Sequence, residues 1–418
     1  MIRRLVPAFA VLVGLVGVAA GAAEPKIEPE LAADPQVVGM IDGLGDNSSC
    51  LLPPIKTVGE FNEVARSYNM QKTGPCGRDY CDRMAWAPDR KRALYCGGNH
   101  GAPHVLNDAW EYDLPSNTWV LLYAPDPDRG KGVGVVVEQE FKGRDGAVKK
   151  ARVLATKRGG PLMAAHTWWG LTYDPDLKAM LWMNATYGTE RTAGKAQGLD
   201  LSNLAPGPTL WAFHPYERKW RHVLTEAPHP KDVEGATLEY IPELKGTVYY
   251  AAEWNWSGMW LYDPQANGWK DLKPNNGAVP YGRKDCPGNE AVMAWDSKSK
   301  VLVAQIGKST FEYDLATNAW KQTLALPKES AEAPNGSDCR SCFAYDSAAG
   351  VCLLLDRSAE LATLWSYRVG EGKWTKLAPQ GPPPLAGKQG YYDPERNVLV
   401  VSRGAQTWLY RHRRAEKK

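Results

Sequence analysis

D-A-W-E-Y-D-L-P-S-N-T-W, residues Asp108 to Trp119, is the stretch from which the fold of this chain is predicted. Trp110 and Tyr112 occupy alternate positions, as in a strand with one buried face. The Asp, Pro, Ser and Asn that follow favour a turn, because proline presets φ and the Asp and Asn side chains hydrogen-bond the local backbone. Trp119 then begins a returning strand. The stretch therefore predicts an aromatic β-hairpin.

The same hairpin recurs along the chain. Clear copies run from Trp260 to Trp269 and from Phe311 to Trp320, and weaker copies close at Trp220 and Trp374. A sixth copy begins at Trp408 and stops before a closing Trp. Successive closing tryptophans are about 50 residues apart, except for a first interval of about twice that length. Self-similarity at this period predicts a propeller or a solenoid.

Each copy has a second hairpin before it. Phe343-Ala344-Tyr345-Asp346, for example, precedes the apolar run Val351 to Leu354. Two hairpins per repeat predict a blade of four antiparallel strands. We therefore expect an all-β, six-bladed propeller, or a seven-bladed one if the long first interval contains a further blade.

At this point the pattern resembles the kelch family of β-propellers, which includes the central domain of galactose oxidase. The matching features are a strand that ends in Gly97-Gly98 and the repeated aromatic-Asp-turn-Asn-x-Trp hairpin, and the resemblance covers about Met84 to Arg413. It implies that one terminus completes the last blade, which removes exposed sheet edges. The segment near Ile55 to Val58 is the expected closing strand.

The N-terminus predicts export. Arg3-Arg4 precede an apolar run from Leu5 to Ala20, and small residues follow. This order is typical of a secretory signal peptide over residues 1–22, with an uncleaved anchor as the alternative. The apolar run is short for a membrane span, which needs about 20 residues. We expect a secreted or periplasmic protein with no transmembrane segment in the mature chain.

The remaining chain is interpreted as one domain. Residues 23–80 form a lead-in that contains the closing strand, and residues 81–414 form the propeller. An insertion at 125–161 is expected to be an extra hairpin, either a decorative flap or a lid, because its strands flank Asp145-Gly146. A second, at 184–208, is rich in small and polar residues and predicts a mobile loop. The charge balance, 50 basic against 47 acidic residues, gives no indication of nucleic acid binding.

The chain contains eight cysteines, and an even number in an exported protein favours disulfides over metal or thiol-redox chemistry. Cys81 and Cys96 share a hairpin, and Cys286 and Cys339 precede adjacent blades, but the connectivity stays open. The candidates are Cys50, Cys76, Cys81, Cys96, Cys286, Cys339, Cys342 and Cys352.

Function is predicted on the face opposite the Asp-containing turns, where the loops between blades surround the mouth of the central channel. Each blade places a polar residue near this mouth, either as a hydrated ring or as a pocket for a sugar or an anionic group. An arginine fork there grips a carboxylate, and a buried glutamate acts as an acid or base. The ligand-binding candidates are Arg83, His166, Glu290, Arg340 and Lys388, beside Asp82; the catalytic candidates are Glu290, Glu234 and His166.

Two further groups lie in irregular loops. Trp254 and Trp256 suit stacking on a sugar face, or packing against the neighbouring insertion. His100 and His104, with His166, are weak candidates for zinc or copper, and no cofactor is expected. Galactose oxidase binds copper through tyrosine and histidine ligands, but this sequence contains no Tyr-His pair, so that site does not carry over.

These observations favour an exported kelch-repeat propeller that binds a carbohydrate or protein ligand at the channel mouth, without catalysis. The alternative is a periplasmic sugar-modifying enzyme of the N-acetylneuraminate epimerase type. A copper oxidase similar to galactose oxidase ranks last. No motif for a nucleophilic hydrolase, a phosphate-binding loop or a zinc protease occurs in the chain.

Overall fold

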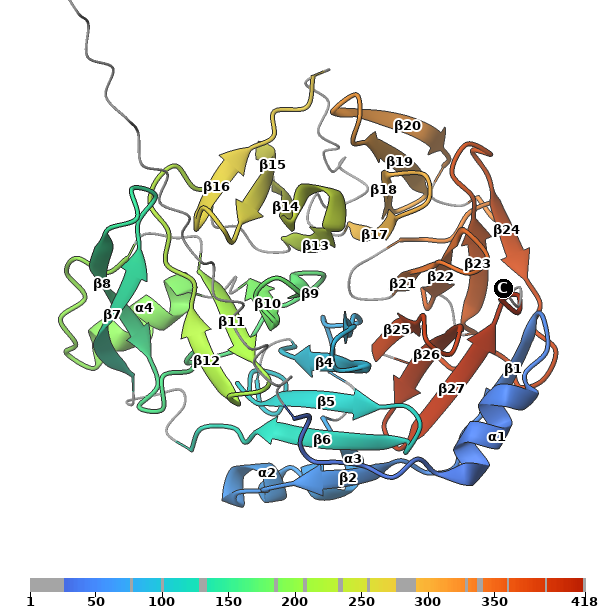
Figure 1. The fold of residues 1–418 in the computed structure, drawn as a ribbon, viewed down its shortest axis with the longest axis horizontal. Coiled ribbons are helices and arrows are strands. Elements are labelled where there is room, and N and C mark those ends of the chain that lie inside the picture. Colours follow the sequence, from blue (N-terminus) through green and yellow to red (C-terminus); the bar gives the residue numbers. More distant parts are fainter. Residues whose placement is uncertain are drawn as a thin grey trace, which may run out of the picture.

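The computed structural model arranges antiparallel sheets around a central channel, as blades of a propeller (Figure 1). It describes residues 26–75, 78–98, 101–127, 134–183, 187–205, 209–231, 236–253, 256–275, 291–327, 330–336, 341–358, 361–387 and 389–415. The predicted signal peptide lies outside these ranges.

Strands of the first three blades follow one another in sequence, from the channel outward. Blade one contains β3 (Ala85–Ala87), β4 (Arg92–Cys96), β5 (Ala109–Asp113) and β6 (Thr118–Tyr123). Blade two contains β9 (Leu171–Asp174), β10 (Ala179–Met183), β11 (Leu210–His214) and β12 (Lys219–His222). Blade three contains β13 (Thr237–Ile241), the short 3-10 helix η1 (Pro242–Leu244), β14 (Gly246–Glu253), β15 (Trp256–Asp263) and β16 (Gly268–Asp271).

The other three blades repeat this order. Blade four contains β17 (Val292–Asp296), β18 (Val301–Ile306), β19 (Ser309–Asp314) and β20 (Ala319–Ala325). Blade five contains β21 (Ser341–Asp346), β22 (Val351–Asp356), β23 (Thr363–Tyr367) and β24 (Trp374–Leu377). Blade six contains β25 (Gln389–Asp393), β26 (Val398–Arg403), β27 (Gln406–Arg411) and the N-terminal strand β1 (Ser48–Leu51). The propeller therefore has six blades, and the residues described in the long first interval form no seventh.

An N-terminal strand closes the ring as predicted, but the strand is a different one. β1 pairs antiparallel with β27, so Ser48 to Leu51 completes blade six. The expected segment, β2 (Lys56–Gly59), instead pairs in parallel with β6 and becomes a fifth, outermost strand of blade one. Three short helices surround these strands: α1 (Pro35–Gly43), α2 (Glu63–Ser67) and α3 (Met70–Thr73).

The repeated hairpin owes its shape to local hydrogen bonds. Asp113 accepts from the backbone N–H of Ser116 at 3.1 Å, and the Tyr112 hydroxyl donates to Asn117 Oδ1 at 2.6 Å. Asn117 has φ +50°, a left-handed conformation that Asn tolerates. The same Tyr–Asn bond recurs between Tyr313 and Asn318 at 2.5 Å. Sequence alone therefore specifies these turns.

The closing tryptophans have the structural role that their repetition predicts. Trp119 packs against Tyr112 with ring centroids 5.0 Å apart, and Trp374 packs against Tyr367 at 5.1 Å. Trp119 is fully buried. Such aromatic pairs contribute about 0.5–1.5 kcal/mol beyond area burial. They join the third and fourth strands of blades one to five.

The two insertions pack together on the outside of blade two (Figure 1). The first contains the predicted hairpin, β7 (Val135–Lys142) and β8 (Val148–Ala155). The second was predicted to be a mobile loop, but it contains the helix α4 (Tyr187–Ala196). The Glu190 carboxylate accepts from the Met163 backbone N–H at 2.9 Å, and the leucines after the helix pack against Leu154. Contacts with the first insertion thus order a segment whose composition favours a loop.

The disulfide prediction is wrong for the cysteines that the structure describes: Cys50, Cys81, Cys96, Cys342 and Cys352 are free thiols. Cys81 and Cys96 form no disulfide; the Cys81 thiol instead donates a hydrogen bond to the Cys96 backbone carbonyl at 3.2 Å. Burial raises the pKa of Cys81 and of Cys342 to about 12. These side chains act as small apolar groups inside the blades. Cys76, Cys286 and Cys339 lie outside the described residues.

Candidate functional site

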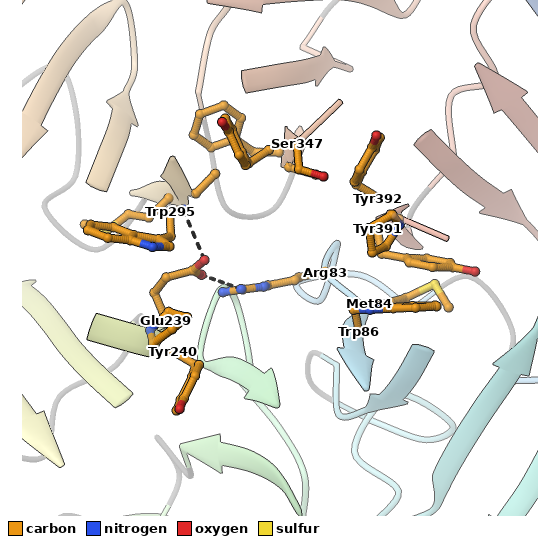
Figure 2. A pocket seen from close by; sticks show the side chains of 17 residues that line it. Arg83, Met84, Trp86, Glu239, Tyr240, Trp295, Ser347, Tyr391 and Tyr392 are labelled. Atoms are coloured by element: carbon orange, nitrogen blue, oxygen red, sulfur yellow. Dashed lines mark hydrogen bonds and ion pairs between the residues drawn. The ribbon is translucent and has the colours of Figure 1, made fainter. Parts of the chain in front are cut away.

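The central channel contains a cavity of about 270 Å³. The first strands of five blades contribute to its wall, and seven of the seventeen lining residues are aromatic (Figure 2). Pro242, Ser347 and Pro394, at the ends of first strands, are exposed members of the lining. The cavity therefore opens toward the face that carries the Asp-containing turns. Its aromatic lining consists of Trp86, Tyr240, Trp295, Phe343, Tyr345, Tyr391 and Tyr392.

An ion pair lies across the cavity. Arg83 extends from the start of blade one toward Glu239 on β13 of blade three, and the two side chains form a hydrogen-bonded salt bridge (Figure 2). A second guanidinium nitrogen of Arg83 donates to the Leu238 carbonyl at 2.5 Å. The other carboxylate oxygen of Glu239 accepts from the Trp295 backbone N–H at 3.2 Å. One pair thus joins residues of blades one, three and four.

A buried tryptophan supports Arg83. The guanidinium lies 5.5 Å from the ring centroid of Trp169, which comes from the segment before β9. Trp169 is fully buried, and its indole N–H donates to the Met293 carbonyl of blade four at 3.0 Å. Contacts between blades that are not neighbours have to pass through the channel. Arg83 and Trp169 therefore cross it.

Burial raises the pKa of Glu239, and Arg83 opposes that shift. The Arg83 and Glu239 side chains are only 14% and 12% exposed. In such surroundings a charge is stable only when it is paired and hydrogen-bonded. The pair therefore gives the cavity two polar groups but no net charge.

Two residues of the cavity wall have side-chain hydrogen-bond donors. The Trp295 indole N–H is buried and has no hydrogen-bond partner in the described part of the protein. The Ser347 hydroxyl lies at the exposed edge. Trp86 stacks on Tyr391 with centroids 5.8 Å apart and planes 12° apart, which fixes a flat apolar wall. Flat apolar walls with a few placed polar groups are typical of sites for small molecules.

Glu239 is a site residue that the sequence analysis missed, although the repeat contains a signal for it. In blades one, four and five the residue before the channel aromatic is alanine: Ala85, Ala294 and Ala344. Blade three places Glu239 there, and blade six places Tyr391. A glutamate at a position where three other blades have alanine is therefore the sequence signal that could have indicated this site.

Arg83 is the predicted ligand-binding residue that lies in the cavity. His166 stands apart from it, where its ring packs edge-on against Trp168 at 4.7 Å. Trp168 in turn contacts Tyr80 at 5.8 Å, and its backbone N–H donates to the Tyr80 carbonyl. His166, Trp168 and Tyr80 all have positive φ, between +45° and +58°. This aromatic cluster lies at the mouth between blades one and two.

Asp82, also predicted near the mouth, is fully buried and forms an ion pair with Arg357 of blade five. Burial raises its pKa to about 7, and Arg357 opposes that shift. The pair links blade one to blade five across blade six. The neighbouring residues Asp82 and Arg83 thus form ion pairs with different blades, Asp82 with blade five and Arg83 with blade three.

The other predicted site residues lie outside the described residues: Glu234, Glu290, Arg340, Lys388, Trp254 and His100. Trp256 begins β15, but its side chain is not described. A site at the channel mouth therefore stays a prediction.

The His104 ring accepts from the Asp79 backbone N–H through Nδ1 at 3.1 Å. Across the described ranges, no three His, Cys, Asp or Glu side chains are grouped to hold a metal ion. Because His100 lies outside those ranges, the weak metal prediction stays a prediction. None of the described helices has the length and apolar character of a membrane span.

Comparison with known proteins assigns no family to this chain. No protein-family model and no curated protein matches the chain. Among solved structures 587 chains match it. One of them is an auxiliary nutrient binding protein from Bacteroides ovatus, which is 10% identical with a TM-score of 0.47, over 87% of this chain and 76% of that chain. Likeness at this level carries no argument, so the chain is identified by its own architecture alone, a six-bladed β-propeller.

Proposed function

We propose that this protein is an exported, kelch-type propeller that binds a small carbohydrate in its channel cavity. The observation that carries the proposal is an aromatic cavity with an Arg83–Glu239 pair across it. Aromatic rings stack on the apolar face of a sugar, while charged groups and the Trp295 N–H bond its hydroxyls. The repeated hairpin supports the kelch assignment, and the N-terminal sequence supports export.

The size of the cavity suits a single ring. Ligand pockets usually measure about 300–1,000 Å³, and this one, at about 270 Å³, lies just below that range. A longer glycan would have to continue outward past Ser347 and Pro394, at the exposed edge. We therefore expect a monosaccharide, or the terminal unit of a longer glycan, as the ligand.

The test is a calorimetric titration of the mature protein with a panel of neutral monosaccharides. Trp295→Phe removes the indole N–H and keeps an aromatic ring, and we expect about tenfold weaker binding, which is typical of one hydrogen bond. Trp254→Ala is the matched variant for a site at the channel mouth, and we expect it to bind normally. Loss of binding in Trp254→Ala alone would move the site to the mouth. Absence of binding by the unmodified protein would overturn the proposal.

A sugar-modifying enzyme of the epimerase type is the second candidate. The favouring observation is the raised pKa of Glu239, because a carboxyl group with a raised pKa can transfer protons near neutral pH. This enzyme would accelerate the exchange between sugar anomers, measured by NMR. Glu239→Gln should abolish the acceleration, and exchange at the uncatalysed rate with the unmodified protein would exclude the enzyme.

A further inference from the structure

We propose that the Arg83–Glu239 pair is a charge filter, which makes the cavity selective for uncharged sugars over both acidic and amino sugars. The inference rests on the proposed carbohydrate binding and adds the class of sugar. Its basis is the position of the pair: one cation and one anion, hydrogen-bonded to each other, are both part of the cavity wall. A ligand therefore meets both charges at once.

An acidic sugar is rejected by Glu239. Its carboxylate can approach Arg83, but the guanidinium already donates to Glu239 and to the Leu238 carbonyl. The incoming anion would then lie beside a second carboxylate in a largely dehydrated site. Like charges in such surroundings repel strongly.

An amino sugar is rejected by Arg83 for the reciprocal reason. Its ammonium group can approach Glu239, whose oxygens already accept from Arg83 and from the Trp295 backbone. The ammonium would lie near a guanidinium that stays charged at every working pH. The surrounding aromatic faces attract cations in general, so they do not reject an amino sugar. Rejection of amino sugars therefore depends on Arg83.

Removing one member of the pair should invert the selectivity toward one charged class. Glu239→Gln leaves Arg83 without its anionic partner, and a ligand carboxylate can then replace that partner. Arg83→Met leaves Glu239, which a ligand ammonium can pair with. The glutamine variant is the sharper of the two, because burial favours a neutral Glu239 once Arg83 is gone.

The experiment measures affinities for matched sugars: glucose, glucuronate and glucosamine, and the corresponding galactose series, at about pH 7. The unmodified protein should prefer the neutral member of a series by at least tenfold. Glu239→Gln should bind the acidic member at least tenfold more tightly than the unmodified protein does. Arg83→Met should also bind the amino member more tightly than the unmodified protein does, but by a smaller factor.

The double variant Arg83→Met/Glu239→Gln distinguishes charge from shape. Its cavity lacks both charges of the pair, so it should gain affinity for neither acidic nor amino sugars. Exposed residues supply the controls: Glu243→Gln and Arg221→Met should keep the affinities of the unmodified protein. Circular dichroism of each variant confirms folding before titration.

The outcomes separate the two proposals. If the unmodified protein binds a neutral sugar and the single variants gain no charged one, the filter is wrong and carbohydrate binding stands. If the unmodified protein prefers a charged member, the filter is likewise wrong. If it binds no member of either series, carbohydrate binding fails and the filter fails with it.

Discussion

Breaking the Arg83–Glu239 pair should destabilise the propeller much more than removing both charges. The two side chains are 14% and 12% exposed, so neither charge regains its hydration when the other is lost. Removal of one partner from a buried pair costs about 3–5 kcal/mol. We expect Arg83→Met and Glu239→Gln each to lower the free energy of unfolding by about 3 kcal/mol.

The double variant should recover most of that loss, because its cavity contains no unpaired charge. Replacing a buried pair by uncharged side chains of similar volume is often close to neutral. Loss of the contact between Arg83 and Trp169 costs about 0.5–2 kcal/mol in both variants that lack the arginine. We therefore expect the double variant within about 2 kcal/mol of the unmodified protein, and a coupling energy of about 4–6 kcal/mol.

Urea denaturation at about pH 7, monitored by circular dichroism and tryptophan fluorescence, measures the four free energies. The exposed pair Arg221–Glu217, with side chains 56% and 45% exposed, provides a control cycle whose coupling should be below about 0.5 kcal/mol. If the losses of the two single variants add in the double variant to within about 0.5 kcal/mol, the residues are not coupled and the reasoning is refuted.

Three further predictions concern pH, packing and thiol chemistry. The folded pKa of Asp82, about 7, exceeds its ordinary value of 3.8, so its contribution to stability is full below about pH 4 and is lost as the pH rises through 7; Asp82→Asn should flatten urea-midpoint profiles over this window, and an unchanged slope would contradict it. Gly97→Ala should lower stability by about 2–5 kcal/mol, because a Cβ there lies 1.9 Å from Thr167 Oγ1 at φ +81°; a thermal midpoint like that of the unmodified protein would exclude this clash. Cys81 and Cys342, which are buried with a pKa of about 12, should react with a thiol reagent only in denaturant, and fast labelling of the native protein would show otherwise.

The repeated hairpins could be predicted because their determinants are local. Tyr112, Asp113, Asn117 and Trp119 lie within eight positions, and each contacts another member of the same turn or strand pair. Such contacts do not depend on how blades are placed. The insertion at 184–208 shows the limit, since α4 is ordered through contacts with a different insertion.

Pairing over long sequence separations could not be predicted. Both β1 and β2 have the composition of short strands, and only the closed ring assigns β1 to β27, about 360 residues away. The buried cysteines were misjudged for a related reason, because a count of thiols does not reveal which blade surrounds each one.

The candidate site divides in the same way. The sequence by itself placed Arg83 near the channel, but the glutamates predicted there were Glu234 and Glu290, which lie outside the described residues. Glu239 was missed, although it stands where three blades have alanine. The tertiary structure alone decided that Arg83 and Glu239 meet, 156 positions apart, above Trp169. The physical reason is that the hairpins of Asp108 to Trp119 and its copies are stabilised within each blade. The cavity exists only where the first strands of separate blades converge on one axis.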